Sequence, residues 1–452
     1  MKALFLAAVL ALGFPMPAMA TPDQNLDLVL RQALEDTGVP GFSAVVTRGD
    51  EVVHVGGYGD GVTERTPMRV ASVSKSFTAA AVMALVDDGK VELDGSVVAQ
   101  LPGFVMEDER ASRITVRQLL NQTSGLADFT MDVSALEQAA SLEEFVAGLR
   151  GASLASDPGV RYRYCNANYD VAARLVEVAS GRSYSEFLRE RVFGPLGMGD
   201  SRVGGEVPDG FNSAFGVWVQ REELPAFRGG SGDVVTTAAD MGKWLISQNG
   251  RGRQVVSASA LEVMHSPSAV AEYGMGWAPD GDGLLIHSGN LFTYTAVEAI
   301  SPRTGYGYAV LVNSASLHDA AYGVLQALVA ATEGREPVSA GGGRQTTELV
   351  LGIVGLLAAL LGVFGVVRAG KWARKRAGRA WWRVVVRLVP GVVPVVVLAA
   401  YPDLVSVLMN GRTVTWAQMT YFPLPLTVVV VVAALAGGAT VGARVWRLWL
   451  LR

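Results

Sequence analysis

Cysteine, histidine and lysine are all scarce in this chain of 452 residues. The single cysteine, Cys165, excludes an internal disulfide and a site built from several thiolates. The four histidines are scattered along the chain, which argues against a zinc site built from histidines. We therefore expect no metal site and no cofactor. The chain has six lysines and 32 arginines. A lysine within a motif is therefore informative, because a lysine can lose its charge and act as a base, whereas an arginine cannot.

Acidic residues are nearly absent from the C-terminal part. From Arg368 to the end, 12 Lys and Arg accompany one acid, Asp403, whereas the preceding residues hold 26 basic and 41 acidic residues, a net charge of −15. The larger part of the chain therefore lacks the cationic surface that nucleic-acid binding requires. We expect no nucleic-acid partner.

The first 20 residues read as a secretory signal peptide. Lys2 supplies a positive start, 3–14 form an apolar run too short to span a bilayer, and 18–20 form a small-x-small cleavage site. We predict a signal peptide over 1–20, with the mature chain beginning at Thr21. The alternative is a buried first helix.

Long apolar runs occur at the other end of the chain. Residues 349–367 carry no charge and are long enough to cross a bilayer as a helix. Two further apolar stretches, 384–409 and 415–437, predict a membrane region with three spans over 348–452. Eight Lys and Arg follow the first stretch over 368–387, with no acid among them, and such a run marks the cytoplasmic side. The second span is the most interrupted, by Pro390, Pro394, Pro402 and Asp403.

This topology predicts a multi-pass protein of the cell membrane, with the lipid bilayer as a partner and the N-terminal domain on the external face. The spans could instead form a transport module. Transport sites need polar groups within the membrane, and these are scarce here, so anchoring is favoured.

The remaining residues predict one external domain over 21–333 and a glycine-rich linker over 334–347. Alternating strands joined by short turns occur near both ends of the domain, and helical patterns occupy its middle. We predict an α+β fold in which both ends build one antiparallel sheet flanked by helices. A helical subdomain inserted between them would leave a cleft, the usual place for a ligand.

Ser72 and Lys75 form the first candidate motif, Ser-x-x-Lys, at the start of a long apolar helix. Their spacing puts both side chains on one helix face. A serine hydroxyl needs a base to become a nucleophile, and a desolvated lysine can lose its charge and serve. The alternative is a helix N-cap followed by an exposed lysine.

Tyr164 and Asn166 form the second candidate motif, which follows a turn and precedes a helix. A phenol near a cationic lysine can be held as phenolate and act as a general base. Asn166 can accept from Lys75 and donate to a substrate carbonyl. The alternative is a buried aromatic residue followed by an asparagine N-cap.

The third candidate motif is His287-Ser288-Gly289-Asn290, after an apolar run. Glycine allows a substrate backbone to lie close to a strand. The histidine can donate a hydrogen bond and be partly charged. The alternative is a turn histidine at the end of a strand.

Taken in order, Ser-x-x-Lys, Tyr-x-Asn and His-x-Gly resemble the motifs of the serine β-lactamase and penicillin-binding-protein superfamily. The closest resemblance is to the branch of class C β-lactamases, D-alanyl-D-alanine carboxypeptidases and related esterases. Residues 114–126 resemble the family's helix and Thr-Ser-Gly-Leu turn, and 229–241 resemble its glycine-rich strand and helix start. The resemblance covers about 25–333, omits the spans, and implies a β-lactamase/transpeptidase-like fold.

The resemblance also implies roles for these residues. Ser72 would be the acylated nucleophile, Lys75 its proton partner, and Tyr164 the base for acylation or water attack. The substrate-binding residues would be Asn166, His287, Ser288, Gly289 and Asn290, with the backbone N–H groups of Ser72 and Asn290 as the oxyanion hole. Cys165 is interpreted as a packed side chain.

His287 departs from the family pattern, because β-lactamases of this branch usually have lysine there. A histidine holds a substrate carboxylate only when protonated, so a peptidase or esterase is favoured over an efficient β-lactamase. We expect a serine hydrolase that acts through an acyl-enzyme on an amide, lactam or ester, with a small-molecule or peptide substrate such as cell-wall material. The alternatives are a penicillin-binding sensor and a non-catalytic binding protein that is acylated without turnover.

Overall fold

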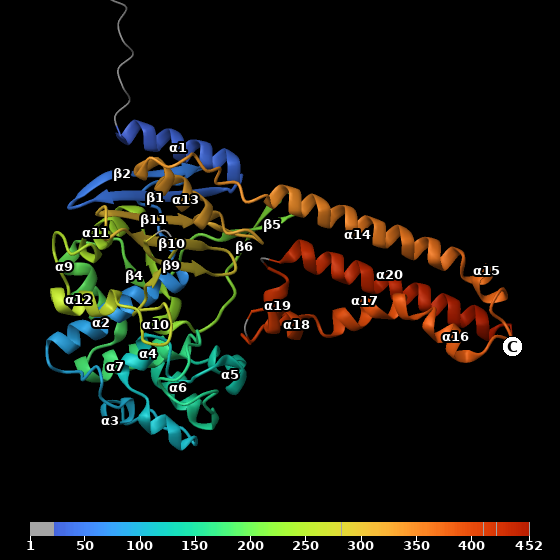
Figure 1. Cartoon of the computed structure of the whole chain (residues 1–452), viewed down its shortest axis with the longest axis horizontal. Helices are drawn as coiled ribbons and strands as arrows, with labels where there is room; N and C mark the ends of the chain where they lie inside the picture. Colours follow the sequence, from blue (N-terminus) through green and yellow to red (C-terminus); the bar gives the residue numbers. More distant parts are fainter. Residues whose placement is uncertain (1–21, 282, 410, 422, 452) are drawn as a thin grey trace, which may run out of the picture.

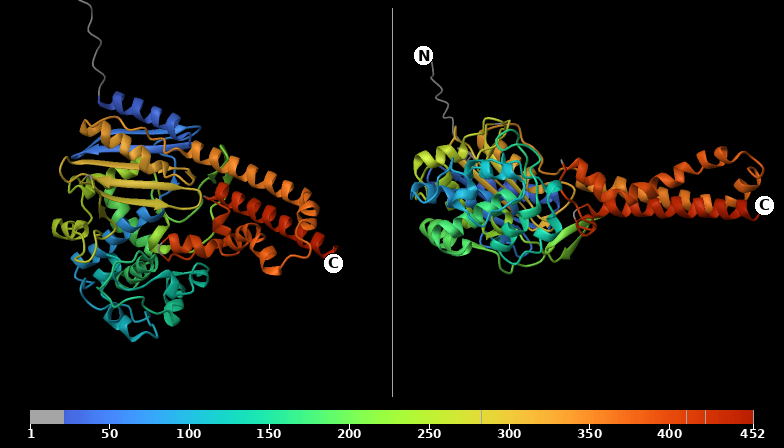
Figure 2. Two further views of the ribbon diagram at one scale, coloured as in Figure 1. Left: turned by 45° about the vertical axis from the view of Figure 1, so that its right-hand side comes forward. Right: turned by 90° about the horizontal axis from the view of Figure 1, so that it is seen from below.

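The computed structural model describes residues 22–281, 283–409, 411–421 and 423–451. The predicted signal peptide, 1–20, and its cleavage site lie outside the described residues. Two parts are visible in Figure 1: a mixed domain, and a set of long helices that extends away from it. The view from below in Figure 2 shows these helices leaving the domain together as a narrow rod.

A six-stranded antiparallel sheet lies at the centre of the domain, in the order β2-β1-β11-β10-β9-β8. Residues from the two ends of the domain pair directly, as Ala44 with Val310. The prediction of one antiparallel sheet built from both ends is therefore confirmed. Its strands are β1 (Gly41–Arg48), β2 (Glu51–Gly59), β8 (Ala278–Pro279), β9 (Leu285–Asn290), β10 (Thr295–Ile300) and β11 (Tyr306–Val312).

Helices cover both faces of this sheet. On one face α1 (Pro22–Thr37) and α13 (Ala320–Glu333) pack together and bury Leu30 and Leu325 in one core. On the other face lies α11 (Ala238–Gln248), with the larger core behind it. Strand β1 is buried on both sides, because Phe42 and Ala44 point into the first core and Val45 into the second.

The helical subdomain lies between the strand pairs in sequence and is built around α2 (Ser74–Asp87). Every residue of α2 from Ser74 to Leu85 is buried, so the helix runs through the interior of the domain. Phe77 of α2 packs on Trp244 of α11, with ring centroids 4.1 Å apart. The other helices of the subdomain are α3 (Val97–Gln100), η2 (Glu109–Arg113), α4 (Val116–Leu120), η3 (Asp128–Thr130), α5 (Val133–Leu136), α6 (Leu142–Gly148), η4 (Leu149–Gly151), α7 (Ala167–Ser180), α8 (Tyr184–Leu188), η5 (Arg189–Phe193) and α9 (Gly194–Leu196).

Two small sheets and two short helices complete the domain. β3 (Met68–Arg69), β7 (Val234–Thr236) and β4 (Arg202–Val203) form one sheet, and β12 (Ser314–Ala315), β5 (Gly210–Ala214) and β6 (Val217–Arg221) form the other. The short helices are α10 (Gly229–Gly232) and α12 (Ala258–His265). Within 229–241, the first four residues are therefore helical, and the strand begins at Val234.

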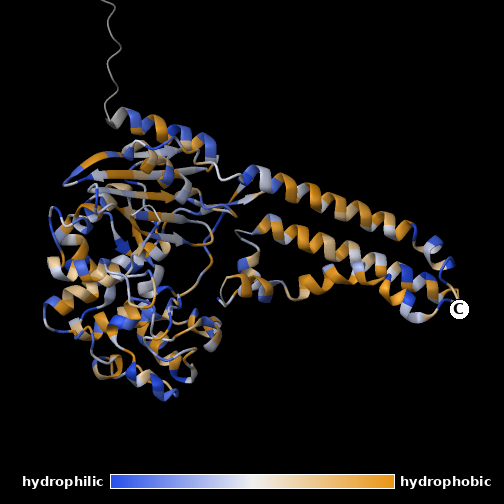
Figure 3. Ribbon diagram, viewed as in Figure 1, coloured by the Kyte–Doolittle hydropathy of each residue, from blue (hydrophilic) through white to orange (hydrophobic). Residues whose placement is uncertain are grey.

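The C-terminal helices are candidate membrane spans. α14 (Arg344–Val367) and α20 (Leu424–Trp449) are each long and apolar enough to cross a membrane, and Figure 3 shows most of their length in the hydrophobic colour. α17 (Val389–Ala399) and α18 (Tyr401–Leu408) meet the same criterion as a pair, with a bend of 68° between them. The described residues thus contain two candidate spans, or three if the bent pair is one span. The short helices beside them are α15 (Ala369–Arg374), α16 (Trp381–Val386) and α19 (Trp416–Met419).

The helix boundaries differ from the predicted spans in ways that packing explains. α14 begins five residues before 349, because its polar first turn is buried against the domain: Arg344 donates to Ser213 Oγ at 2.8 Å and Glu348 accepts from the Gly216 N–H at 2.6 Å. α20 begins later than the predicted span over 415–437 and extends beyond it. Thr415 caps the separate helix α19 through the Gln418 N–H instead.

Candidate active site

Ser72 lies where a strand turns into the central helix. β3 ends at Arg69, the turn η1 (Ala71–Val73) follows, and α2 begins at Ser74. Ala71, directly before the serine, has a φ of 51°, a left-handed conformation that costs an alanine about 1 kcal/mol or more. Such a conformation persists only where the surroundings fix it. Ser72 is therefore held on a constrained turn at the wall of a cavity.

Gly289 of strand β9 packs against this turn. A Cβ atom built at Gly289 would lie 2.2 Å from Val70 O, 3.0 Å from the Ala71 Cβ and 3.0 Å from the Ser72 nitrogen. No side chain fits at the first of these distances. Glycine therefore allows the strand to approach the backbone of the serine directly.

Lys75 is completely buried one turn after Ser72. Its Nζ donates to Ser72 Oγ at 3.0 Å, to Asn166 Oδ1 at 3.0 Å and to the Ser231 carbonyl at 2.7 Å. These three acceptors equal the number of N–H donors of an ammonium group. The alternative of an exposed lysine is therefore wrong.

Burial is the main cause that lowers the pKa of Lys75 to about 7; the negative charge of Asp170 opposes this shift, and the positive charge of Arg412 contributes to it. Burial likewise raises the pKa of the Asp170 carboxyl, which accepts from the Ser231 N–H at 3.0 Å. A lysine in this range exists in both charge states near neutral pH. When neutral, it can accept the proton of Ser72.

Tyr164 lies beside this pair. Its ring centroid is 4.9 Å from Lys75 Nζ. Burial raises the pKa of Tyr164 to about 12, and a hydrogen bond with Ser72 opposes the shift. The phenol is therefore protonated at neutral pH, which corrects the expectation of a phenolate, because desolvation outweighs the hydrogen bond with Ser72 and the charge of Arg412.

Asn166 points its side-chain oxygen at Lys75. It precedes α7, but its side chain makes no capping hydrogen bond there, so the N-cap alternative is wrong. Cys165 between the two motif residues is fully buried, and burial raises the pKa of its thiol, as expected for a packed side chain.

His287 is buried and makes hydrogen bonds with both ring nitrogens. Its Nδ1 lies 2.8 Å from the Ser288 carbonyl and its Nε2 lies 3.0 Å from the Tyr273 hydroxyl. A carbonyl only accepts, so we assign the proton to Nδ1 and the accepting role to Nε2. Burial, and next the charge of Lys75, lower the pKa of His287 to about 3. The expectation of a partly charged histidine is therefore wrong.

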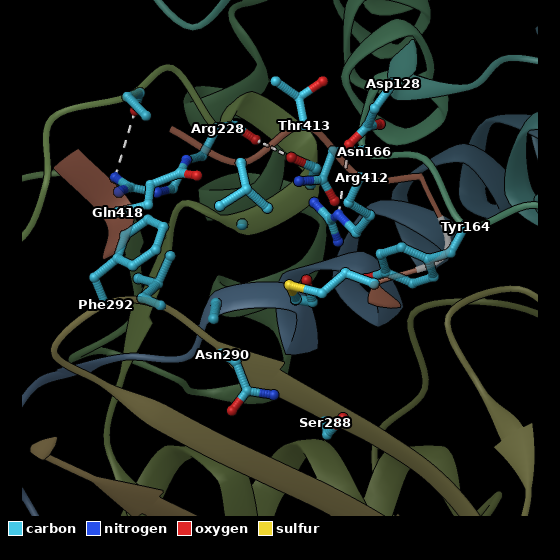
Figure 4. A pocket seen from close by; sticks show the side chains of 18 of the residues that line it. Asp128, Tyr164, Asn166, Arg228, Ser288, Asn290, Phe292, Arg412, Thr413 and Gln418 are labelled. Atoms are coloured by element: carbon cyan, nitrogen blue, oxygen red, sulfur yellow. Dashed lines mark hydrogen bonds and ion pairs between the residues drawn. The ribbon is translucent and has the colours of Figure 1, made fainter. Parts of the chain in front are cut away.

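One cavity of about 810 Å³ joins these residues. Figure 4 shows Tyr164, Asn166, Ser288 and Asn290 around it. Of the residues that the motifs single out, those in the cavity wall are Ser72, Tyr164, Asn166, His287, Ser288 and Asn290. Lys75 and Gly289 lie behind the wall, each in contact with Ser72 or its backbone.

Several residues of the site carry no motif. Tyr273 lies 14 residues before its partner His287, and Ser231 contributes a backbone carbonyl, so neither leaves a sequence signal. Asp170 follows Asn166 by four residues on α7, and this helical spacing is the signal by which it could have been found.

A second group of wall residues comes from the C-terminal region that holds the candidate membrane spans. These residues are Met409, Arg412, Thr413, Val414, Gln418 and Met419, from the segment between α18 and α20. The predicted spans include Met409, Gln418 and Met419, and only 410–414 form the predicted connection between two spans. The structure places the segment against the cleft of the domain.

Comparison with known proteins places the whole domain in one family. The Beta-lactamase family model matches residues 26–333. Penicillin-binding protein 4 of Amycolatopsis lactamdurans is 32% identical over 292 residues, which cover 57% of this chain and 74% of that protein. Protein flp of Staphylococcus aureus is 25% identical, and the chain spans 63% of its length, less than two thirds.

Solved structures agree with this fold. A D-amino acid amidase from Ochrobactrum anthropi superposes with a TM-score of 0.57 at 26% identity, covering 68% of this chain and 98% of that one. The octameric penicillin-binding protein homologue from Pyrococcus abyssi gives a TM-score of 0.60 at 24% identity, covering 69% and 77%. The chain therefore belongs to the β-lactamase family, whose relatives include penicillin-binding proteins.

Proposed function

We propose that this protein is a membrane-anchored serine hydrolase that acts outside the cytoplasm and forms an acyl-enzyme on an amide, lactam or ester. The observation that carries the proposal is the contact between Lys75 Nζ and Ser72 Oγ, 3.0 Å apart in a site that removes lysine from water. A buried lysine of lowered pKa is the base that a serine nucleophile needs.

In acylation, neutral Lys75 keeps two donors on Asn166 and the Ser231 carbonyl, and its lone pair faces Ser72 Oγ. As Oγ bonds to the substrate carbonyl carbon, its proton passes to Lys75. The carbonyl oxygen becomes an oxyanion, for which we assign the backbone N–H groups of Ser72 and Asn290. Each such donor contributes about 10²–10³ in rate.

Collapse of this intermediate breaks the bond to the leaving nitrogen or oxygen, which needs a proton. Tyr164 is protonated and touches Ser72, so it gives its proton to the leaving group and regains one from Lys75. In deacylation the steps reverse: water loses a proton to the Tyr164–Lys75 pair, attacks the acyl carbon, and Ser72 is released with its proton.

The neutral state of His287 bears on the substrate. A neutral imidazole already engaged by Tyr273 cannot hold a carboxylate as a lysine would. This favours amide or ester hydrolysis over efficient β-lactam hydrolysis. The resemblance to a D-amino acid amidase at 26% identity supports the same choice.

The membrane region supports anchoring with the domain outside. α14 starts at the domain, and the basic segment that follows it lies at the far end of the helices, as Figure 1 shows. Basic residues at one end of a set of spans mark the cytoplasmic side. The domain then lies on the opposite face.

Substitution of Ser72→Ala in the full chain tests the proposal. We expect the variant to lose covalent labelling by a fluorescent penicillin and by an activated ester, which intact-mass spectrometry measures. We also expect it to lose turnover of an amide substrate. Ser185→Ala, at an exposed serine of α8, is the control and keeps both. Labelling that survives Ser72→Ala would refute the assignment of the nucleophile. A persistent adduct on the wild type without turnover would favour the sensor alternative.

A further inference from the structure

We infer that the segment between α18 and α20 completes the active site, and that Arg412 in it binds an oxyanion of the substrate, a carboxylate or phosphate. The inference rests on the proposed hydrolase function, because it assigns a substrate class to that same site. It makes the membrane region part of the catalytic apparatus as well as an anchor.

Arg412 shares the cavity with the proposed nucleophile. Ser72 and Tyr164 form one side of this cavity, and Met409, Arg412 and Thr413 form part of another. An acyl group on Ser72 would therefore lie in a space bounded by this segment. Figure 4 shows Arg412 between Asp128 and the ring of Tyr164.

The guanidinium of Arg412 is close to the reacting groups and open to the cavity. Its Cζ lies 5.6 Å from the centroid of the Tyr164 ring. Its Nε lies 3.5 Å from Asp128 Oδ2, in an ion pair whose arginine side chain is 35% exposed and whose aspartate is 10% exposed. Because this ion pair is made through Nε, the two terminal nitrogens of the guanidinium can bind a second anion through two parallel hydrogen bonds.

The other basic side chains near the cavity, those of Lys75, Arg228 and His287, already bind protein groups. Lys75 gives three hydrogen bonds to protein acceptors. Arg228 pairs with Glu223 at 3.1 Å and also donates to the Leu224 carbonyl. His287 has both ring nitrogens engaged and is neutral.

The acids in the cavity wall are Asp128, Glu137, Asp170, Asp280 and Asp319. Asp128 is the one paired with Arg412, and Asp170 accepts from Ser231. Among the described residues of this wall, Arg412 is thus a partly exposed cation placed over the Tyr164 ring. A planar guanidinium suits carboxylate and phosphate groups in particular.

Contacts on both sides hold the segment in place. Gly411, with a φ of +82°, lies so close to the domain that an added Cβ would be 3.0 Å from the Phe129 ring. Beyond Arg412, the Arg221 guanidinium stacks on the Tyr421 ring at 3.6 Å, and the Tyr421 hydroxyl donates to the Glu222 carbonyl at 3.1 Å. A cation fixed in this way loses little conformational freedom when it binds an anion.

Equilibrium binding to the full chain carrying Ser72→Ala tests the inference without requiring turnover. The probes are N-acetyl-D-alanyl-D-alanine and its C-terminal amide, which differ by one charge. We expect Arg412→Ala to weaken binding of the acid by about 10- to 100-fold and binding of the amide by less than about threefold. Arg412→Lys should lie between, because it keeps the charge and loses the fork. Arg412→Gln serves if the alanine variant does not fold.

Arg303→Ala is the matched control. It removes another arginine that makes an ion pair, with Glu333 at 3.3 Å, but Arg303 neither lines the cavity nor contacts the described part of the segment between α18 and α20. We expect it to affect the two probes equally. An acid-to-amide preference that is the same with and without Arg412, or that Arg303→Ala lowers as much, overturns the inference.

A second arm asks where the oxyanion comes from. In the same Ser72→Ala chain, micelles containing phosphatidic acid or phosphatidylcholine compete with the dipeptide acid. Competition by phosphatidic acid alone, lost in Arg412→Ala, identifies a lipid phosphate, whereas retained binding of the soluble acid identifies a free carboxylate; both support the oxyanion site. Failure of the wild type to be acylated at Ser72 would overturn the proposed function but not the oxyanion site, because the binding measurements do not depend on acylation.

Discussion

The close approach of strand β9 to Ser72, the proposed nucleophile, makes Gly289→Ala the most informative single substitution. The new Cβ would lie 2.2 Å from Val70 O and 3.0 Å from the Ser72 nitrogen. Both are backbone atoms, so no side chain can rotate to relieve the overlap. The strand must move away from Ser72 by roughly 1 Å, the difference between that contact and an ordinary van der Waals distance.

Two effects should follow. Overpacking of this kind costs about 1–3 kcal/mol of unfolding free energy. Withdrawing the strand also separates the proposed donors of the oxyanion hole, and losing one donor lowers kcat by about 10²–10³, or roughly 2.7–4 kcal/mol of transition-state stabilisation. We therefore expect a folded protein whose acylation is slowed far more than its stability suggests.

Acylation can be followed as the rate of labelling by an activated ester, with thermal unfolding measured in parallel. Gly199→Ala is the control, because a Cβ there meets no atom within 4 Å. A Gly289→Ala variant that acylates within about threefold of the wild type would refute the argument that glycine sets the distance between β9 and Ser72.

Two further predictions concern buried titratable groups. Because the pKa of Lys75 is lowered to about 7 and its neutral form is the proposed base, kcat/KM should rise as the pH increases through about 7. Lys75→Arg should lose at least about 10³-fold activity at every pH, since a guanidinium does not deprotonate; a variant that stays active would exclude Lys75 as the base. Glu298 is fully buried, accepts from Trp244 Nε1 at 2.9 Å, and burial raises its pKa to about 8 from the usual 4.5. The folded state therefore keeps the Glu298 proton up to a higher pH than the unfolded state. The contribution of this protonated carboxyl to the unfolding free energy is complete below about pH 4.5 and is lost as the pH rises to about 8. Glu298→Gln should remove this part of the pH dependence of urea unfolding, and an unchanged pH profile would contradict the assignment.

The sheet and the convergence of the motifs follow from patterns that sequence carries well. Alternating strands at both ends of the domain predict which segments pair, because the period of two fixes which face is buried. Ser72 and Lys75 are three residues apart, so their proximity is a local matter of helix geometry. The pairing of Lys75 with Asn166 needed the family resemblance, since 91 residues separate them.

The charge states and the membrane-side wall of the cavity could not be predicted in the same way. Protonation of Tyr164 and neutrality of His287 depend on burial, which no local pattern reports. Arg412 lies in a short polar connection between apolar stretches, and such a connection looks the same whether it faces solvent or an active site. Its place in the cavity depends on how the membrane helices dock on β6 and the loop after it.

The pairing of β1 with β11 also bears on how the chain folds as it is synthesised. Ala44 lies opposite Val310, so two neighbouring strands of the sheet come from the first and last parts of the domain to be made. Until the later strand is made, β1 and β2 form an isolated hairpin, which has marginal stability in water. Contacts between such distant segments form slowly. The domain therefore exposes apolar strand edges until its synthesis is complete, and it should depend on chaperones more than a protein of local topology would.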